Sequence, residues 1–163
     1  MTYKSHHVAI LASAGSLSLL SGAWIFQALG YAPCAMCIWQ RYPHAIAILL
    51  GLVVLFGLRH IGIYLLGAAA AATTAGLGLY HSGVERGWWE GPSTCTGSGF
   101  DMLGLSGQQL LSTSGPSNVV MCDEVVWEFL SLSMASWNAI FSLMIAVFWV
   151  IAAVLAYRSR ASV

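Results

Sequence analysis

Four long apolar segments constrain the fold of this chain more than any other feature. None of them contains Asp, Glu, Lys or Arg, and they cover residues 8–29, 42–58, 61–80 and 137–157. An apolar helix of roughly 20 residues crosses the ~30 Å hydrocarbon core of a bilayer. The chain of 163 residues is 58% hydrophobic and only 7% charged, whereas a soluble domain is roughly 25% charged. We therefore predict an all-α membrane protein, a single integral membrane domain over residues 1–163 that forms a bundle of four transmembrane helices.

The lengths of the first two segments decide how they are interpreted. The first follows Lys4, as in a signal peptide, but it is longer than the ~7–15-residue apolar core of such a peptide, so we expect a retained span. The second is short, and we expect its helix to start near residue 38, which places Pro43 in the first turns, where a missing N–H costs little. The Ala- and Gly-rich third segment should pack closely against its neighbours. The predicted spans are residues 8–29, 38–58, 61–80 and 137–157.

Charged residues are divided unevenly between the two sides of the predicted bundle. Four spans place both termini on one side, together with Lys4, Arg59, Arg158 and Arg160. The other side holds Arg41, Arg86 and all six acidic residues, which lie between positions 85 and 128. The positive-inside rule therefore predicts a multi-pass protein of the bacterial inner (cytoplasmic) membrane with both termini in the cytoplasm. The net charge of zero gives no basic surface of the kind that binds nucleic acid.

This topology places two loops in the periplasm, residues 30–37 and residues 81–136. The second loop is long and contains an apolar stretch among polar neighbours at residues 100–111. That stretch fits either a short amphipathic piece on the membrane surface or a loop packed on itself.

A C-x-x-C motif, Cys34 and Cys37, lies just before the second span. A thiol near a helix start is biased toward thiolate by the helix dipole. Arg41 follows Cys37 by four residues and so lies on the same helix face, where its guanidinium would stabilise a thiolate or donate hydrogen bonds to a carbonyl oxygen of a bound acceptor. The alternative is a static disulfide with Arg41 as a topology anchor at the interface. His44 lies on roughly the same side of the helix and could line the same pocket.

Cys95 and Cys122 form a second pair in the long loop. A structural disulfide between them would stabilise the fold by roughly 3 kcal/mol, but two dithiols on one membrane face can also exchange by thiolate attack. The spacing does not fit a zinc ribbon, and Ile38 stands where a c-type haem site needs histidine, so we expect no metal. His81, at the outer end of the third span, is either an interfacial residue or a ligand.

These features resemble the disulfide bond formation protein B (DsbB) family over nearly the whole chain. The similarity includes four spans, a C-x-x-C followed by Gln40 and Arg41, and a long second loop with two cysteines. It also includes a run near the fourth span, Cys122-Asp123-Glu124 followed by Trp127, Phe129, Met134 and Trp137.

The resemblance implies a membrane thiol:quinone oxidoreductase that supports disulfide bond formation. Such a protein reoxidises a periplasmic thioredoxin-fold (DsbA-like) partner and passes the electrons to ubiquinone or menaquinone in the membrane pool. By the same resemblance, Cys95 would form the mixed disulfide with the partner and Cys122 would relay to Cys34. Cys37 would face the quinone, with Arg41 helping to bind it and His81 near it.

Two other functions remain compatible with these residues. One is a dedicated oxidase for a single specialised DsbA-like partner. The other is a non-enzymatic membrane scaffold or small transporter with two structural disulfides. The absence of charged residues from the spans argues against ion transport, which needs buried ionisable groups.

Overall fold

The computed structural model describes residues 4–92, 95 and 121–161 of the chain. Within these residues four helices are long and apolar enough to cross a membrane, which confirms the predicted fold class. They are α1 (Ser5–Ala28), α2 (Ala35–Leu55), α3 (Ile61–Glu85) and α5 (Met134–Ala161). In the bundle α1 packs against α2 and α5, and α3 packs against α2 and α5, so each helix has two main neighbours.

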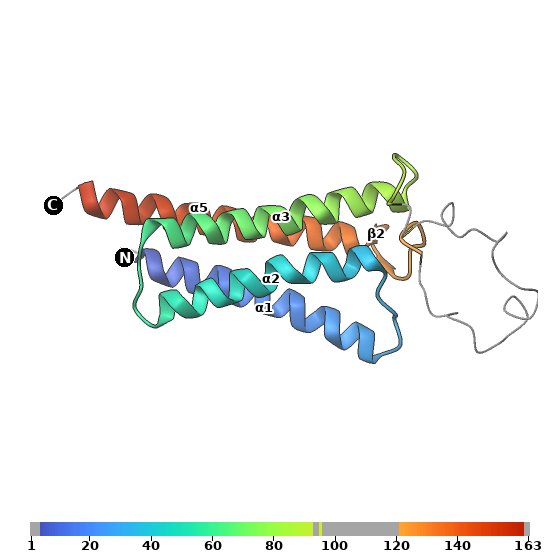
Figure 1. Ribbon diagram of the computed structural model, residues 1–163, viewed down its shortest axis with the longest axis horizontal. Coiled ribbons are helices and arrows are strands. Elements are labelled where there is room, and N and C mark those ends of the chain that lie inside the picture. Colours follow the sequence, from blue (N-terminus) through green and yellow to red (C-terminus); the bar gives the residue numbers. More distant parts are fainter. Residues whose placement is uncertain (1–3, 93–94, 96–120, 162–163) are drawn as a thin grey trace, which may run out of the picture.

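The bundle has two chemically different ends (Figure 1). The two termini and the turn between α2 and α3 lie at one end. The opposite end holds the loop between α1 and α2, the end of α3 and a short antiparallel hairpin of β1 (Glu128–Phe129) and β2 (Leu132–Ser133). Both cysteine pairs belong to segments at this second end, which we call the cysteine end.

Several helix boundaries differ from those of the predicted spans, and three of the differences, all at the cysteine end, shape the site. Helix α2 starts at Ala35 rather than near 38 because Cys34 caps it, so Pro43 lies well inside the helix and not in its first turns. Helix α3 continues to Glu85 instead of ending at 80, and α5 begins at Met134. The hairpin was not expected, and the apolar stretch at residues 100–111 lies outside the described residues.

Small residues let α3 approach α5 closely. Gly67 faces the ring of the fully buried Trp149, and a Cβ at this position would lie 2.5 Å from the ring. Nearer the cysteine end, a Cβ at Gly78 would lie 3.0 Å from backbone atoms of Ala135 and Ala139. In lipid such close backbone approach supplies the van der Waals contact that holds helices together. It also fixes the rotation of α3, and therefore the direction in which His81 points.

A Gly67→Ala substitution should destabilise the bundle, because the new methyl group overlaps the Trp149 ring in a packed core. We expect the free energy of unfolding to fall by about 1–3 kcal/mol, measured by denaturant titration of the protein in detergent micelles. Gly76→Ala is the matched control on the same helix, since a Cβ there meets nothing within 4 Å. Equal stability of the two variants would contradict the proposed contact.

Candidate redox site at the cysteine end

The C-x-x-C motif forms the N-terminus of α2. Cys34 is the N-cap residue, and its sulfur accepts a hydrogen bond from the backbone N–H of Cys37 at 3.3 Å. Both cysteines are free thiols, and the Cys34 thiol donates to the Cys37 sulfur at 3.1 Å. Cys34 is only 4% exposed, whereas Cys37 is partly exposed. The two sulfurs are thus close enough to form a bond with little movement, and they differ in access.

In the reduced pair the Cys34 thiol is the hydrogen-bond donor. Its hydrogen bond to Cys37 and its burial raise the pKa of Cys34 above the usual range of a thiol. A thiolate on Cys34 would lose this hydrogen bond and would place negative charge in a poorly solvated site. Cys37 is therefore the sulfur that receives the hydrogen bond in the reduced pair.

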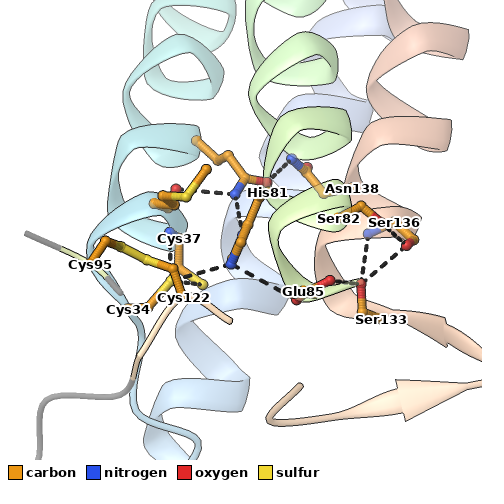
Figure 2. Close-up of polar contacts among 12 residues, drawn as sticks. Cys34, Cys37, His81, Ser82, Glu85, Cys95, Cys122, Ser133, Ser136 and Asn138 are labelled. Atoms are coloured by element: carbon orange, nitrogen blue, oxygen red, sulfur yellow. Dashed lines mark hydrogen bonds and ion pairs between the residues drawn. A yellow bond between two sulfur atoms is a disulfide. The ribbon is translucent and has the colours of Figure 1, made fainter. Parts of the chain in front are cut away.

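The second cysteine pair lies against the first. Cys95 and Cys122 are joined by a disulfide, and both are buried. The sulfurs of Cys34, Cys95 and Cys122 all lie within 4.8 Å of one another (Figure 2). A backbone hydrogen bond of 2.7 Å from Cys122 N to the Cys95 carbonyl supports this arrangement. A free thiol and a disulfide in contact are the two reactants of thiol–disulfide exchange.

His81 and Glu85, one helical turn apart on α3, flank the thiols. His81 is 2% exposed, and its Nε2 lies 3.5 Å from the Cys34 sulfur and 3.8 Å from a Glu85 carboxylate oxygen. Figure 2 shows the imidazole of His81 between Cys34 and Glu85. The Glu85 carboxylate also accepts a hydrogen bond from the Ser133 hydroxyl of β2. The extension of α3 past residue 80 is what places both ionisable groups at the thiols.

A buried chain of amides connects His81 to the interior of the bundle. The Gln40 side chain bonds the other ring nitrogen of His81, Nδ1, at 3.0 Å, and its oxygen accepts from the Asn138 amide at 2.7 Å. The oxygen of Asn138 in turn lies 2.9 Å from Nε2 of His44. These side chains come from α2, α3 and α5, so one hydrogen-bond chain ties three helices together.

An apolar cavity of about 410 Å³ opens beside the thiols. Its lining includes Cys34, Cys37, Arg41, His44 and His81, and the four aromatic or methionine residues of the run that follows Cys122, namely Trp127, Phe129, Met134 and Trp137. Pockets of this size, with apolar walls and few polar groups, are typical of small-molecule sites. The expected residues of the C-x-x-C helix and His81 thus share one cavity.

The guanidinium of Arg41 contacts helix α1. Its guanidinium donates to the Gln27 side chain at 2.7 Å and to the Ala23 carbonyl at 3.5 Å, both on α1. Among the described residues, Nε of Arg41 is buried and has no hydrogen-bond partner, and the same holds for Nδ1 of His44. Arg41 therefore joins α2 to α1, and one of its N–H donors has no partner among the described residues.

Sequence reasoning did not identify Glu85 or Asn138 as site residues, and it noted Gln40 only as part of a motif. Glu85 follows His81 by four residues, which signals a shared helix face only once α3 is known to reach residue 85. Asn138 is a polar residue at the start of an apolar span, a position where a buried hydrogen-bond partner is expected. That signal was present in the sequence and was not used.

Fold and site together define a multi-pass helical membrane protein that holds a free dithiol in contact with a disulfide at one end of its bundle. The chain belongs to the disulfide bond formation protein B (DsbB) family, because the family model "Disulfide bond formation protein DsbB" matches residues 5–152. This confirms the resemblance drawn from the motifs.

Individual relatives agree with this assignment. The chain is 33% identical over 141 residues to a disulfide bond formation protein B of Verminephrobacter eiseniae, covering 80% of this chain and 76% of the relative. It is 29% identical over 149 residues to the protein of that name from Acidovorax sp., covering 86% and 82%. An uncharacterised protein of Rickettsia prowazekii is 26% identical over 136 residues, covering 82% and 78%. No solved structure matches the chain.

Alkylation should distinguish the two free thiols. We expect a maleimide to label Cys37 before Cys34 at neutral pH, because the raised pKa of Cys34 keeps it protonated and burial hides it. Labelling of Cys34 should increase only at a pH above the usual thiol range. Mass spectrometry of peptides from unreduced protein measures both rates, with the disulfide-bonded Cys95 and Cys122 as unlabelled internal controls. Replacing Cys37 by alanine removes the hydrogen bond and should lower the pH at which Cys34 reacts. If Cys34 were labelled faster than Cys37 in the unaltered protein, the assignment of Cys34 as the protonated hydrogen-bond donor would be contradicted.

Proposed function

We propose that this protein is a membrane thiol:quinone oxidoreductase that reoxidises a thioredoxin-fold, DsbA-like partner. The observation that carries the proposal is the position of the Cys34 sulfur between its own partner and the loop disulfide. It lies 3.1 Å from the Cys37 sulfur and within 4.8 Å of the sulfurs of Cys95 and Cys122. Electrons from the loop pair therefore reach Cys37 and the cavity through the sulfur of Cys34. Family membership and the relatives' printed name, disulfide bond formation protein B, support this proposal.

The exchange begins on the loop disulfide. A thiolate of the partner attacks Cys95, forms a mixed disulfide and releases Cys122 as a thiolate. Cys122 attacks Cys34 in an oxidised Cys34–Cys37 pair, so that a Cys34–Cys122 disulfide forms and Cys37 leaves as a thiolate.

Two further exchanges complete the transfer. The partner's second thiol releases Cys95, and the partner departs as a disulfide. Cys95 then attacks Cys122, which restores the loop disulfide and releases Cys34. The protein now holds a Cys95–Cys122 disulfide and a Cys34–Cys37 dithiol, which is the arrangement in the structure.

The cavity fits a quinone headgroup as the electron acceptor. Its walls are mostly apolar, and Arg41 is one of the few charged side chains that line it; a guanidinium N–H suits the carbonyl oxygen of a quinone, an acceptor without a proton. His44 lines the same space. When bound, a quinone supplies a two-electron, two-proton oxidant for the Cys34–Cys37 dithiol. Cys37 presents the more accessible sulfur of that pair.

The charge distribution supports one orientation in the membrane, and that orientation supports a periplasmic partner. Lys4, Arg59 and the C-terminal arginines belong to the end opposite the cysteines. The positive-inside rule then supports cytoplasmic termini and a cysteine end in the periplasm of a bacterial inner membrane. The periplasm is a compartment in which disulfides form and persist, and in which a soluble thioredoxin-fold oxidase needs to be reoxidised.

Quinone reduction tests this proposal directly. Membranes containing the protein should reduce ubiquinone or menaquinone when supplied with a reduced thioredoxin-fold partner. Cys37→Ser should abolish the reaction, because the dithiol can no longer form a disulfide. Arg41→Ala should raise the KM for quinone roughly tenfold through loss of a charge-assisted hydrogen bond, whereas Arg59→Ala at the other end should not change it. Full activity of the Cys37→Ser protein would rule the mechanism out.

Trapping of the partner tests the order of the relay. The Cys122→Ser protein has no loop disulfide, so it is mixed with the oxidised partner: the Cys95 thiolate attacks the partner's disulfide, a mixed disulfide forms and the partner's second sulfur leaves as a thiolate. Cys122 is absent and cannot displace the partner from Cys95, so a covalent complex should be seen on non-reducing gels. Cys95→Ser is the matched control and should give no complex. A scaffold with structural disulfides would form no complex in either variant, and a dedicated oxidase would trap one DsbA-like protein but not others.

A further inference from the structure

The hydrogen bonds around His81 determine which of its ring nitrogens carries the proton. The assignment can begin at Met36, whose backbone carbonyl can only accept. The Gln40 side-chain nitrogen bonds this carbonyl at 3.0 Å, so that atom is the NH2 group of the amide. The same NH2 group bonds Nδ1 of His81 at 3.0 Å. Nδ1 must therefore accept, and in the neutral ring the proton is on Nε2.

A second backbone carbonyl leads to the same assignment. The Thr74 hydroxyl donates to the carbonyl of Gln40 at 3.1 Å, so its oxygen accepts from the Asn138 NH2 group at 3.3 Å. That NH2 group also donates to the Gln40 side-chain oxygen at 2.7 Å. The oxygen of the Gln40 amide thus faces Asn138, which leaves its nitrogen for His81. Gln40 is 6% exposed, so water does not compete with these partners.

The tautomer matters because Nε2 is the nitrogen that faces the sulfurs. It lies 3.5 Å from Cys34 and 3.8 Å from Glu85, and the ring also bonds the backbone carbonyl of Cys122. All three neighbours accept hydrogen bonds. The ligand atoms of Cys34, Cys37 and His81 also lie within 4.8 Å of one another, a spacing compatible with a metal. A metal needs a bare ring nitrogen, however, and this tautomer presents a proton instead.

We propose that Gln40 is a positioning residue that holds His81 as the Nε2–H tautomer, so that His81 donates a hydrogen bond to the sulfur of Cys34 whenever that sulfur is a thiolate. This inference rests on the proposed exchange at Cys34. In that exchange Cys95 attacks Cys122, the Cys122–Cys34 bond breaks, and both electrons of the bond remain on Cys34. The sulfur leaves beside Cys37, and two negative sulfurs at this distance would repel each other. A hydrogen-bond donor to Cys34 stabilises the leaving thiolate and speeds the step.

The first measurement reads the tautomer without requiring any redox activity. Nitrogen-15 NMR of histidine-labelled, full-length protein in lipid nanodiscs separates protonated from bare ring nitrogens, and His81→Gln identifies the signals of His81. We expect Nε2 protonated and Nδ1 bare. Gln40→Glu should reverse this, because a carboxylate accepts from Nδ1–H, and Gln40→Met should give a mixture. A bare Nε2 in the unaltered protein, or a Gln40→Glu protein with Nδ1 still bare, would overturn the proposal.

The second measurement follows the thiolate. In a Cys37→Ala background, the alkylation rate of Cys34 is recorded against pH. The titratable groups that face Cys34 are then His81 and Glu85 on α3, while Arg41 on α2 and Glu124 line the shared cavity. We expect Gln40→Met and Gln40→Glu each to slow the reaction roughly tenfold at a given neutral pH, as expected for loss of one hydrogen bond to a charged group. His81→Gln, whose amide can still donate, should retain more reactivity than His81→Ala.

Controls separate this role from charge, packing and the proposed function itself. Ser13→Ala removes a buried hydroxyl between α1 and α2 and should leave the Cys34 profile unchanged. A slower reaction in Gln40→Glu but not in Gln40→Met would show a charge effect and refute the tautomer role. Neither measurement uses quinone or partner. A confirmed tautomer with no quinone reduction would therefore refute the proposed function alone, and quinone reduction with the wrong tautomer would refute this inference alone.

Discussion

The hydrogen bond between Gln40 and His81 joins the two parts of this molecule, the bundle interior and the thiols. In a membrane a buried amide has no water to bond, so each of its donors and acceptors needs a partner on a neighbouring helix. Gln40 meets this requirement with Met36 on its own helix, Asn138 on α5 and His81 on α3. The same bonds that satisfy the amide hold the imidazole against Cys34. Satisfaction of polar groups in the bundle therefore also sets the geometry at the reactive sulfur.

The two thiols of the C-x-x-C motif have distinct surroundings because of where α2 begins. As the N-cap, Cys34 lies outside the helix, buried against the loop disulfide and His81. Cys37 lies one turn into the helix, partly exposed, where it accepts the proton of Cys34 in a hydrogen bond. A start at residue 38 would have left both cysteines in an irregular loop without this division. One helix boundary thus separates the sulfur that contacts the loop pair from the sulfur that is more open to the cavity.

Much of this fold could be predicted from the sequence, because apolar length and charge asymmetry act along the chain. The four helices, the Cys34–Cys37 motif and the shared end of the two cysteine pairs need only counting and the positive-inside rule. The contacts of Arg41 with Gln27 and of Gln40 with Asn138 depend instead on how each helix is rotated about its axis. That rotation is set by small residues such as Gly67 and Gly78, whose contacts lie on another helix. Hydropathy identified the apolar core of α3 but not its last turn, where polar His81 and Glu85 are held by tertiary partners.

The burial of the loop disulfide adds a requirement to the proposed relay. Cys95 is 3% exposed and Cys122 is fully buried, so a soluble partner has no path to the Cys95 sulfur in the arrangement described here. Exchange with Cys34 needs that arrangement, whereas attack by a partner needs Cys95 at the surface. The proposed relay therefore requires the Cys95–Cys122 disulfide to occupy two positions, one against Cys34 and one away from it.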